Sequence, residues 1–408
     1  MPASRVIFVN RFFWPDHSAT SQLLSDLAFH LARRGTNVSV ITSRGLYDDP
    51  AADLPPLETV DGVTVHRVCE PRFGRNTTFG RAADYLAMYR TFAVAALRLA
   101  NRDDCLVVKT DPPLIGAALA PIARAKGVRL INWLQDLYPE VALGLGMTAL
   151  APVTPLLVAA RNASLKIAAK NVAIGERMRD RVGACGVSSE RIETIANWCD
   201  DENIVPRSAK CNALRAEWGM TGKFVVGYSG NLGRAHEYHT LLGAAERLRA
   251  QPDIIFLFIG GGHLTKTLKA DIEQRDLAHM FRFQPYQDVS RLAFSLSVPD
   301  VHWISLRPSM EGLIVPSKFY GVAAAGRATI AVCDPDGEIA RLTARYACGA
   351  TVSPGDSVSL ADLILELKGD ASRLQEMGHN ARSMLEANYR RREALQRWEH
   401  LLEATSRQ

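Results

Sequence analysis

The chain has 408 residues, of which 47% are hydrophobic and 22% are charged, and its formal net charge is +5. This length is too great for one ordinary hydrophobic core, so we expect two globular domains of about 200 residues each. The charge is mild, and no dense block of lysine and arginine interleaved with aromatic residues is present. These features argue against nucleic acid as a partner.

Cysteine usage and the N-terminal residues predict a cytoplasmic protein. The seven cysteines are widely spaced and form no C-x-x-C pair, so neither a zinc site nor a disulfide framework is indicated, and we expect no metal and no cofactor. The N-terminal residues lack the basic region and apolar core of a signal peptide. The uncharged segment Val141–Ala160 spans 20 residues but contains two glycines and two prolines. A loop and the start of a helix are therefore expected there rather than a membrane-spanning helix.

The first residues predict a βαβ unit. A strand at Val6–Val9 precedes a polar loop, a helical pattern from Ala19 to Arg34 and a strand at Asn37–Thr42. Such a unit implies a right-handed crossover and a parallel sheet. The loop Asn10–Ser18 lacks the G-x-G-x-x-G pattern of a dinucleotide-binding fold.

The next predicted elements are a strand at Val63–Val68 and a long amphipathic helix at Phe79–Arg102. The aromatic stripe of this helix is typical of a core face, and a lipid-facing surface is the alternative. Strands at Leu106–Lys109 and Val128–Trp133 follow.

Each of these last two strands runs into a polar loop, T-D-P-P and Q-D-L-Y-P-E respectively. Open α/β sheets bind their ligands at such strand ends, which makes Asp111 and Asp136 candidates. Either aspartate could instead cap the following helix or turn. We interpret Asp111 as structural and Asp136 as functional.

The segment Arg161–Arg181 contains six basic residues against Glu176 and Asp180. A basic helical surface directly after an uncharged segment could rest on an anionic membrane. A solvated helix face is the alternative.

Beyond the strand predicted at Ile192–Ile195, the polar stretch Asp200–Lys210 reads as an interdomain linker. Strands and helical segments then alternate, which predicts a second doubly wound domain. The predicted strands are Phe224–Ser229, Ile254–Ile259, Met280–Gln284, Val301–Ile304, Thr329–Cys333 and Ala350–Val352. Helical sequence at Ala371–Leu402, with a break near Asn388–Tyr389, ends the chain.

Three strand ends of this second domain carry glycine-bearing loops. G-N-L-G-R follows the first strand and includes Arg234, G-G-G follows the second, and a loop and helix containing Lys318 follow the strand at Val301–Ile304. Glycine lets the backbone approach a ligand closely, and helix N-termini attract phosphate. A lysine in the first turn of a helix opposes the helix dipole, and an anionic ligand at the site would explain it. We therefore predict a diphosphate site, with a solvated surface lysine as the alternative for Lys318.

Several motifs together resemble the GT-B glycosyltransferases of family 4, close to the branch that builds bacterial surface polysaccharides such as colanic acid, O-antigen and exopolysaccharide. The motifs are T-D-P-P, Q-D-L-Y-P-E, N-W-x-D, S-G-N-L-G-R-A-H and P-S-K-x-Y-G. The resemblance implies an α/β protein with two Rossmann-like, doubly wound parallel-sheet domains facing a central cleft. The corresponding boundaries are an acceptor domain at 1–199, a linker at 200–222, a donor domain at 223–385 and a helix at 386–408 that crosses back to the acceptor domain.

The resemblance also implies a retaining transferase that moves a sugar from a nucleotide-sugar donor to a hydroxyl of a saccharide or lipid-linked saccharide. The sequence departs from the usual family pattern in two respects. Of two glutamates eight positions apart only Glu311 is present, and Asn231 and His236 occupy the offsets of the usual arginine and lysine. Arg234 and Lys318 would then supply the positive charge.

Site residues follow from the motifs and the resemblance together. Catalytic roles are predicted for Asp136, Arg234 and Lys318. Donor binding is predicted for Gly230, Asn231, Gly233, Arg234, Gly261, Gly262, Glu311, Gly312, Leu313, Pro316, Ser317, Lys318 and Glu338. The acceptor side is predicted to include His17, Ser18, Asp111 and Asp136. Glu338 could contact a donor hydroxyl, or it could be an ordinary acidic residue in the first turn of a helix.

Two other classes of protein remain open on the sequence. One is a nucleotide-sugar epimerase of the same architecture, and the other is a non-catalytic nucleotide-binding scaffold. A glycosidase would need two carboxylates flanking the bond to be cleaved, and the sequence nominates no such pair.

Overall fold

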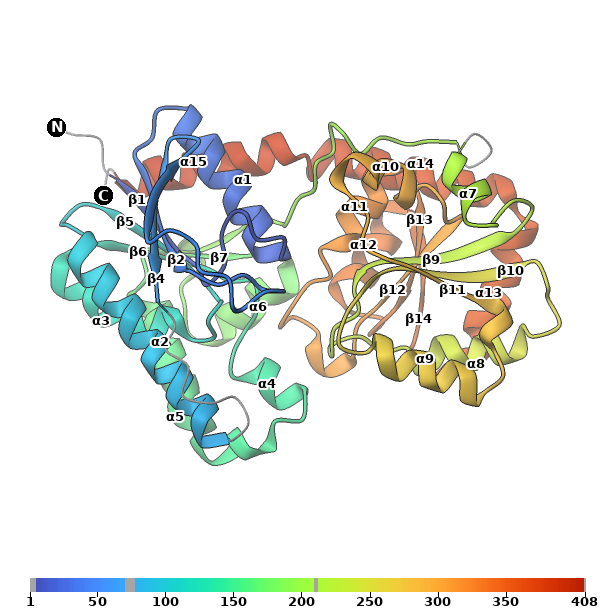
Figure 1. Ribbon diagram of the computed structural model, residues 1–408, viewed down its shortest axis with the longest axis horizontal. Helices are drawn as coiled ribbons and strands as arrows, with labels where there is room; N and C mark the ends of the chain where they lie inside the picture. The colour runs from blue at the N-terminus through green and yellow to red at the C-terminus, as the bar shows by residue number, and fades with distance from the viewer. Residues whose placement is uncertain (1–4, 70–77, 209–211, 407–408) are drawn as a thin grey trace. The chain divides into compact units, whose positions relative to one another are not determined.

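The computed structural model describes residues 5–69, 78–208 and 212–406 (Figure 1). The chain divides into two compact units. The first consists of residues 1–196 together with 394–408, and the second is the continuous stretch between them, residues 197–393. Each unit is an α/β structure built on its own sheet.

The first unit contains an eight-stranded sheet in the order β3-β4-β2-β1-β5-β6-β7-β8. Its strands are parallel except for the edge strand β3, which runs antiparallel to β4. The strands are β1 (Val6–Val9), β2 (Val38–Ser43), β3 (Leu57–Val60), β4 (Val63–Val68), β5 (Cys105–Lys109), β6 (Arg129–Trp133), β7 (Lys170–Ala173) and β8 (Ile192–Thr194). The central strands β1, β2 and β5 are buried along their whole length, which explains their continuous apolar sequence.

Helices cover this sheet, and α2, α3 and α5 lie next to one another (Figure 1). The helices are α1 (Ala19–Arg33), α2 (Thr78–Leu99), α3 (Ile115–Lys126), α4 (Glu140–Gly144), α5 (Thr154–Ile167) and α6 (Glu176–Ala184), with a 3-10 turn η1 (Thr148–Val153) before α5. Met88 and Phe92 of the stripe on α2 belong to the core, as the preferred interpretation predicts, whereas Tyr85 is exposed. Leu86 and Leu97 of the same helix are exposed.

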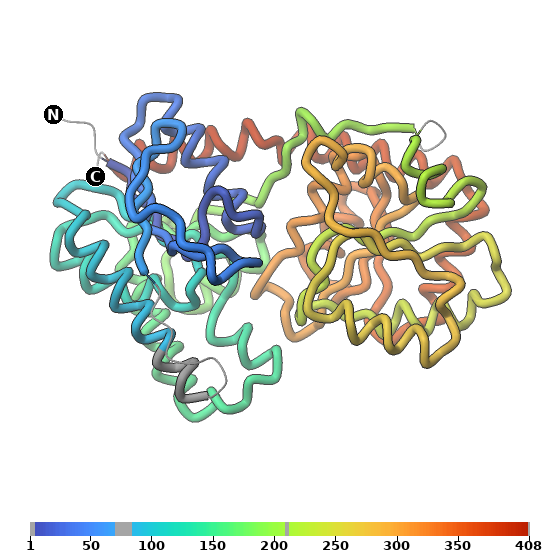
Figure 2. The backbone as a smooth tube through the Cα atoms, viewed as in Figure 1, coloured from blue at the N-terminus to red at the C-terminus, as the bar shows by residue number. Residues whose placement is uncertain are grey.

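The last helix, α15 (Arg391–Ser406), supplies the end of the chain to the first unit. Figure 2 shows this red segment beside blue α1. A side-chain contact joins the two helices, because His30 Nε2 of α1 lies 3.1 Å from Glu399 Oε1 of α15. Trp398 packs on Trp133 of β6 with ring centroids 4.6 Å apart. Both indoles are buried, so the terminal helix completes the core of this unit.

The second unit contains a six-stranded parallel sheet in the order β11-β10-β9-β12-β13-β14. Its strands are β9 (Phe224–Asn231), β10 (Ile254–Gly261), β11 (Phe281–Gln284), β12 (Val301–Ser305), β13 (Ala328–Val332) and β14 (Gly349–Val352). Its helices are α7 (Ala213–Glu217), α8 (His239–Arg247), α9 (Thr265–Gln274), α10 (Leu292–Leu296), α11 (Lys318–Ala324), α12 (Glu338–Tyr346), α13 (Ser357–Gly369) and α14 (Ala371–Asn388). Figure 1 shows α8 and α9 on one side of this sheet and α10, α11 and α14 on the other.

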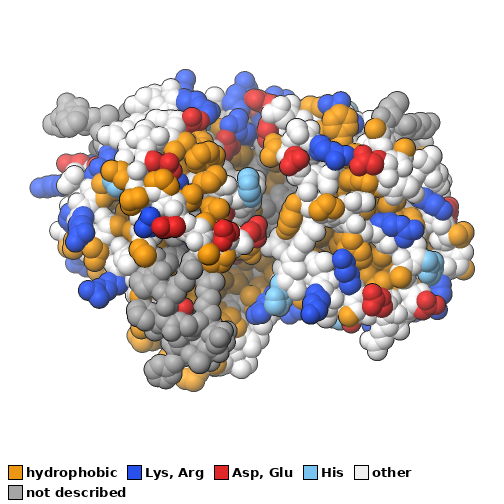
Figure 3. Space-filling model, viewed as in Figure 1, with side chains coloured by type: hydrophobic (Ala, Val, Ile, Leu, Met, Phe, Trp, Pro, Cys, Tyr) orange, Lys and Arg blue, Asp and Glu red, His pale blue; other side chains and the backbone are white. Residues whose placement is uncertain are grey.

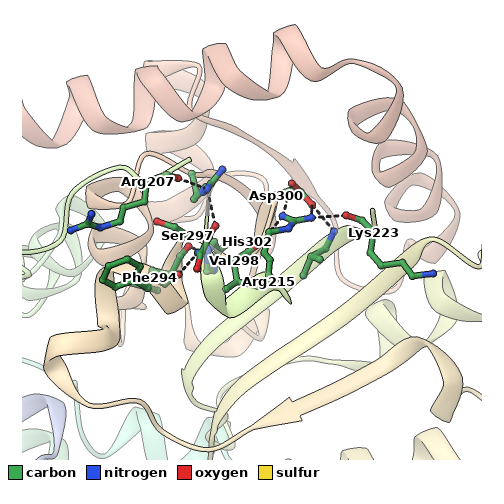
Figure 4. A network of polar contacts seen from close by, with 12 residues as sticks. Arg207, Arg215, Lys223, Phe294, Ser297, Val298, Asp300 and His302 are labelled. Carbon is green, nitrogen blue, oxygen red and sulfur yellow. Dashed lines mark hydrogen bonds and ion pairs between the residues drawn. The ribbon is translucent and has the colours of Figure 1, made fainter. Parts of the chain in front are cut away.

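A polar network ties the chain that enters the second unit to the starts of β9 and β12 (Figure 4). Arg215 donates two hydrogen bonds to Asp300, at 3.0 and 3.1 Å, and further bonds to the carbonyl oxygens of Val298 and Lys223. Asp300 also accepts from the Val225 amide at 2.8 Å. Such paired guanidinium–carboxylate bonds fix geometry well. They anchor the N-terminal ends of these strands, whereas the glycine loops lie at the C-terminal ends.

Charged side chains of both signs are interspersed over the face drawn in Figure 3. The segment Arg161–Arg181 does not form the single basic helical surface that was one of its two interpretations. Arg161 is buried and bonded to Glu140, with Nη2 and Oε1 2.7 Å apart. Lys170 begins strand β7, so the segment is not one helix. No helix among the residues the structure describes is long and apolar enough to cross a bilayer.

Candidate active site

In the second unit, the glycine loops after β9 and β10 are packed against each other. The two strands stay in register up to their last residues, where Gly230 pairs with Gly260 and Asn231 with Gly261. Gly230 and Gly262 have φ angles of +120° and +133°, which a residue with a side chain rarely adopts. A Cβ on Gly262 would lie 2.4 Å from Asn231 Oδ1. The glycines therefore let the loops interlock.

The loop between β9 and α8 is tied to the end of β12. His236 Nδ1 lies 2.6 Å from the Ser305 carbonyl oxygen, and the Glu237 amide donates to Ser305 Oγ at 3.1 Å. The Arg307 amide donates to the Ala235 carbonyl at 2.9 Å. The ends of β9 and β12 are adjacent through these bonds, as expected for parallel strands of one sheet.

Lys318, the first residue of α11, brings its ammonium to this corner. Its Nζ lies 2.7 Å from Tyr228 Oη and 3.0 Å from His236 Nε2. Its Cε lies 3.5 Å from the position of a Cβ on Gly230, so any side chain there would meet the lysine arm. The structure thus brings together Gly230 and Lys318, which the sequence singled out as donor-binding residues, with two residues that it did not.

Burial sets the charge of this cluster. Loss of solvent around Lys318 lowers the pKa of its amine to about 7. Burial, and then the positive charge of Lys318, lower the pKa of His236 to about 3. Burial raises the pKa of Tyr228 well above its ordinary value. Near neutral pH the histidine and the tyrosine are therefore uncharged, and the lysine is the group that titrates.

Glu311 and Glu338 meet at the start of α12. Glu311 Oε2 accepts a hydrogen bond from the Glu338 amide at 3.3 Å, and both residues are buried. A Cβ on Gly337 would lie 2.4 Å from Glu311 Oε1, so this glycine makes room for the carboxylate. A negative charge at a helix N-terminus stabilises the helix. Glu311 thus has a structural role at α12, whatever it contacts in a donor.

The other predicted donor residues surround this corner with differing exposure. Arg234 is exposed, on the same loop as His236, while Asn231 is exposed at the end of β9. Gly233 has open space at its Cβ position. Gly312 has a φ angle of +71° and lies in a turn. The remaining residues are Leu313 and Pro316, which are buried, and Ser317, which is partly buried and precedes α11.

In the first unit, Asp136 lies in the loop after β6. It is 3.4 Å from Thr110 Oγ1, which follows β5. Burial raises the pKa of Asp136 to about 6, against the opposing effects of Thr110 and Lys109. A carboxyl group with a pKa near the working pH can act as a general base. The α4 N-cap is Pro139, so the alternative that Asp136 caps this helix is not observed.

Lys109, the last residue of β5, is fully enclosed in the same region. Its ammonium donates to the Thr20 carbonyl at 3.0 Å and lies 3.7 Å from the centre of the Trp133 ring. Burial drives the pKa of Lys109 well down, while the negative charges of Asp136 and Asp111 act to raise it. The cation–π contact and the two carboxylates hold this lysine beside Asp136.

Asp111 is placed by its backbone, since its carbonyl accepts from the Arg11 amide at 2.7 Å. The α3 N-cap is Leu114, so Asp111 does not cap that helix. His17 is exposed, and its carbonyl accepts from the Gln22 side chain at 2.7 Å. Ser18 is the N-cap of α1 but makes no side-chain cap bond. These residues belong to the loops that follow the C-terminal ends of β1 and β5 in the first sheet.

Three buried polar residues were missed as site candidates on the sequence: Tyr228, His236 and Lys109. His236 was noted only as the residue at the offset of the family's usual lysine. A lysine or tyrosine near the end of a predicted strand was an available signal for the other two. Within the described part of the chain, no group of three or more His, Cys, Asp or Glu residues is arranged to hold a metal ion.

Comparison with known proteins identifies the class. Two α/β units, each built on a mainly parallel sheet, have the fold of GT-B glycosyltransferases. Sucrose-phosphate synthase from Thermosynechococcus elongatus superposes with a TM-score of 0.78 at 15% identity, covering 98% of each chain. Anabaena HepE, solved in complex with UDP-glucose, superposes with a TM-score of 0.72 at 15% identity, covering 98% of this chain and 99% of that one. These likenesses confirm the predicted fold.

Sequence matches identify the family. Residues 20–198 match the glycosyl transferase 4-like domain, and residues 212–384 match the glycosyl transferases group 1. The chain is a retaining glycosyltransferase of this group. The probable glycosyltransferase WbjE of Pseudomonas aeruginosa is 25% identical over 95% of this chain and 94% of its own length. The putative colanic acid biosynthesis glycosyl transferase WcaI of Escherichia coli K12 is 26% identical over 54% of this chain and 55% of its own.

Proposed function

We propose that this enzyme transfers a sugar, with retention, from a nucleotide-sugar donor to a hydroxyl of a saccharide or lipid-linked saccharide during assembly of a bacterial surface polysaccharide. The observation that carries the donor half is the Lys318 ammonium, held by Tyr228 and His236 beside the glycine loops of the second unit. The relatives support the process, since WcaI is named for colanic acid biosynthesis. The resemblance of the P-S-K-x-Y-G motif to the branch that builds surface polysaccharides supports the same process.

In this proposal Lys318 and the exposed Arg234 contact the donor diphosphate. Their charges stabilise the leaving nucleotide as negative charge develops on its phosphate, which is where electrostatic stabilisation lowers the barrier most. The backbone at Gly230, Gly233, Gly261 and Gly262 lines the phosphates. Glu311 and Glu338 contact the sugar or ribose hydroxyls through their carboxylate groups.

The acceptor half of the proposal rests on Asp136 in the first unit. No covalent intermediate with the enzyme forms. The bond between the sugar and the diphosphate breaks, the acceptor hydroxyl attacks the cation-like sugar from the same face, and the departing phosphate oxygen takes the hydroxyl proton. Asp136, ionised near neutral pH because its pKa is about 6, accepts a hydrogen bond from the acceptor hydroxyl, which orients that hydroxyl and assists transfer of its proton to the phosphate oxygen. Asp111, His17 and Ser18 contribute to the acceptor side.

We further propose that the acceptor is carried on a membrane lipid and that the enzyme works at the cytoplasmic face of the membrane. Exposed apolar side chains on the helical covering of the first unit support this view. They are Met147, Val153 and Leu156 near η1 and the start of α5, and Leu86 and Leu97 on α2. Flotation with anionic vesicles at low salt measures the contact, and a protein that stays in the dense fraction would exclude it.

Slow hydrolysis of a panel of nucleotide sugars tests the donor proposal. We expect one or a few donors to be hydrolysed, and the Lys318→Met variant to lose this activity. Conversion of a donor alone into a different nucleotide sugar would instead identify an epimerase. A folded protein that binds nucleotide but turns over no donor would be a scaffold, and the proposal would be wrong.

A further inference from the structure

The arm of Lys318 is held in place by two groups that are themselves fixed. A lysine side chain has several rotatable bonds, and ordering it costs conformational entropy. Here Tyr228 and His236 are buried, with 2% and 8% of their surfaces exposed. Their rings pack edge to face with centroids 5.6 Å apart. Rigid acceptors therefore hold a flexible donor.

The hydrogen-bond pattern assigns a direction to each contact. Tyr228 Oη lies 2.7 Å from the Asn231 carbonyl oxygen, which can only accept, so the phenol donates there and offers its lone pair to Lys318. His236 Nδ1 lies 2.6 Å from the Ser305 carbonyl oxygen, so Nδ1 carries the proton and Nε2 accepts. Two backbone carbonyls, at the ends of β9 and β12, thus turn two side chains into acceptors for one ammonium.

The neutral form of His236 is the one that suits a charged Lys318. A protonated His236 would have no acceptor nitrogen and would repel Lys318, whereas the neutral tautomer accepts from it. An ammonium has three hydrogens, and two are directed at Tyr228 and His236. With two hydrogens directed at fixed acceptors, the third hydrogen of the ammonium also has a fixed direction.

We infer that Tyr228 and His236 are positioning residues that orient the Lys318 ammonium towards the donor diphosphate, with His236 acting as a neutral hydrogen-bond acceptor. This inference rests on the proposed donor site. It assigns roles to two residues that were not predicted to bind the donor. It also explains how Lys318 on α11 can supply the positive charge when His236 stands at the offset of the family's usual lysine.

Binding of UDP and GDP, measured by calorimetry, tests the inference without requiring turnover. We expect His236→Leu and Tyr228→Phe each to weaken the tighter nucleotide about tenfold, because each removes one hydrogen bond to a charged group. His236→Gln can place an amide oxygen near the Nε2 position, so we expect it to bind within about threefold of the wild type. Tyr238→Phe is the matched control. Tyr238 is a buried tyrosine of the same unit that bonds Asp271 and not Lys318.

The pH dependence of binding gives a second measurement that a merely structural role would not change. The groups around the ammonium are Tyr228 on β9, His236 in the loop and, beside His236, Arg307 after β12. Acceptors favour the charged amine, so removing one lowers the pKa of Lys318 further. Binding by His236→Leu and Tyr228→Phe should therefore weaken at a lower pH than binding by the wild type, while His236→Gln and Tyr238→Phe should follow the wild type.

The outcomes separate the inference from the proposed function. If the folded wild type binds neither nucleotide, the donor site itself is wrong. If the wild type binds and His236→Leu or Tyr228→Phe binds equally well with the same pH dependence, the positioning role is wrong. A loss in His236→Gln as large as that in His236→Leu would also overturn it. Thermal unfolding identifies a variant that does not fold, and Tyr228→Phe, which loses one oxygen, then decides the question.

Discussion

Raising the pH from about 6 to about 8 should weaken the binding of nucleoside diphosphates to this enzyme about tenfold, because binding requires the charged form of Lys318. The pKa of the free lysine is lowered to about 7 by burial. The Lys318 amine is therefore protonated in most molecules of the unliganded enzyme at the lower pH, and in about one molecule in ten at the higher pH. If the bound diphosphate keeps the amine charged, the lost affinity corresponds to ~1.4 kcal/mol.

Calorimetry measures both parts of this prediction. The dissociation constants of UDP and GDP give the change in affinity, and titrations in two buffers with different heats of ionisation count the protons bound with the ligand. We expect proton uptake approaching one per nucleotide at the higher pH, after correction for the terminal phosphate. Lys318→Arg supplies that correction, since arginine stays charged throughout and only the ligand then titrates. A wild type whose affinity and proton uptake match those of Lys318→Arg would refute the reasoning.

Three further changes test other parts of the structure. Asp136→Asn should reduce sugar transfer at least about a hundredfold and abolish the rise in activity through about pH 6, with nucleotide binding unchanged; retained transfer would exclude a role for this carboxylate. Glu311→Ala should cost about 1 kcal/mol by removing the charge at the start of α12, with Glu311→Gln costing less; an unchanged melting temperature would show that the cap contributes nothing. Trp398→Ala should cost about 3–5 kcal/mol in urea unfolding because it empties the space beside Trp133, and a loss below about 1 kcal/mol would contradict this packing.

Much of the fold could be predicted from the sequence because parallel strands buried on both faces leave continuous apolar runs. The runs at Val6–Val9 and Ile254–Ile259 are of this kind, and both lie within strands. Two strands were missed, the edge strand β3 and the short strand β7. β3, at Leu57–Val60, alternates between exposed and partly buried residues, and β7, at Lys170–Ala173, begins with a lysine. The edge strand β3 has a weak apolar pattern because it is largely exposed, and β7, with four residues, is too short to leave a long apolar run.

The site was only partly predictable, since its chemistry depends on which side chains tertiary packing brings together. Lys318 could be nominated because a lysine in the first turn of a helix opposes the helix dipole. Its acceptors could not, because Tyr228 and His236 lie 90 and 82 positions away from it in the sequence. The role of Gly337 was also invisible, since the Glu311 carboxylate that it accommodates lies on another loop.

The first unit is interrupted in the sequence, and this affects how the protein is made. Residues 197–393 are a continuous insertion, whereas the earlier unit recovers Trp398 and its neighbours only from the last turns of the chain. The ribosome therefore completes the whole second unit before it synthesises residues 394–408, which belong to the first unit. During synthesis the second unit can fold completely while the first unit still lacks part of its hydrophobic core. Loss of the codons for Trp398 and its neighbours would then harm the unit that is encoded first.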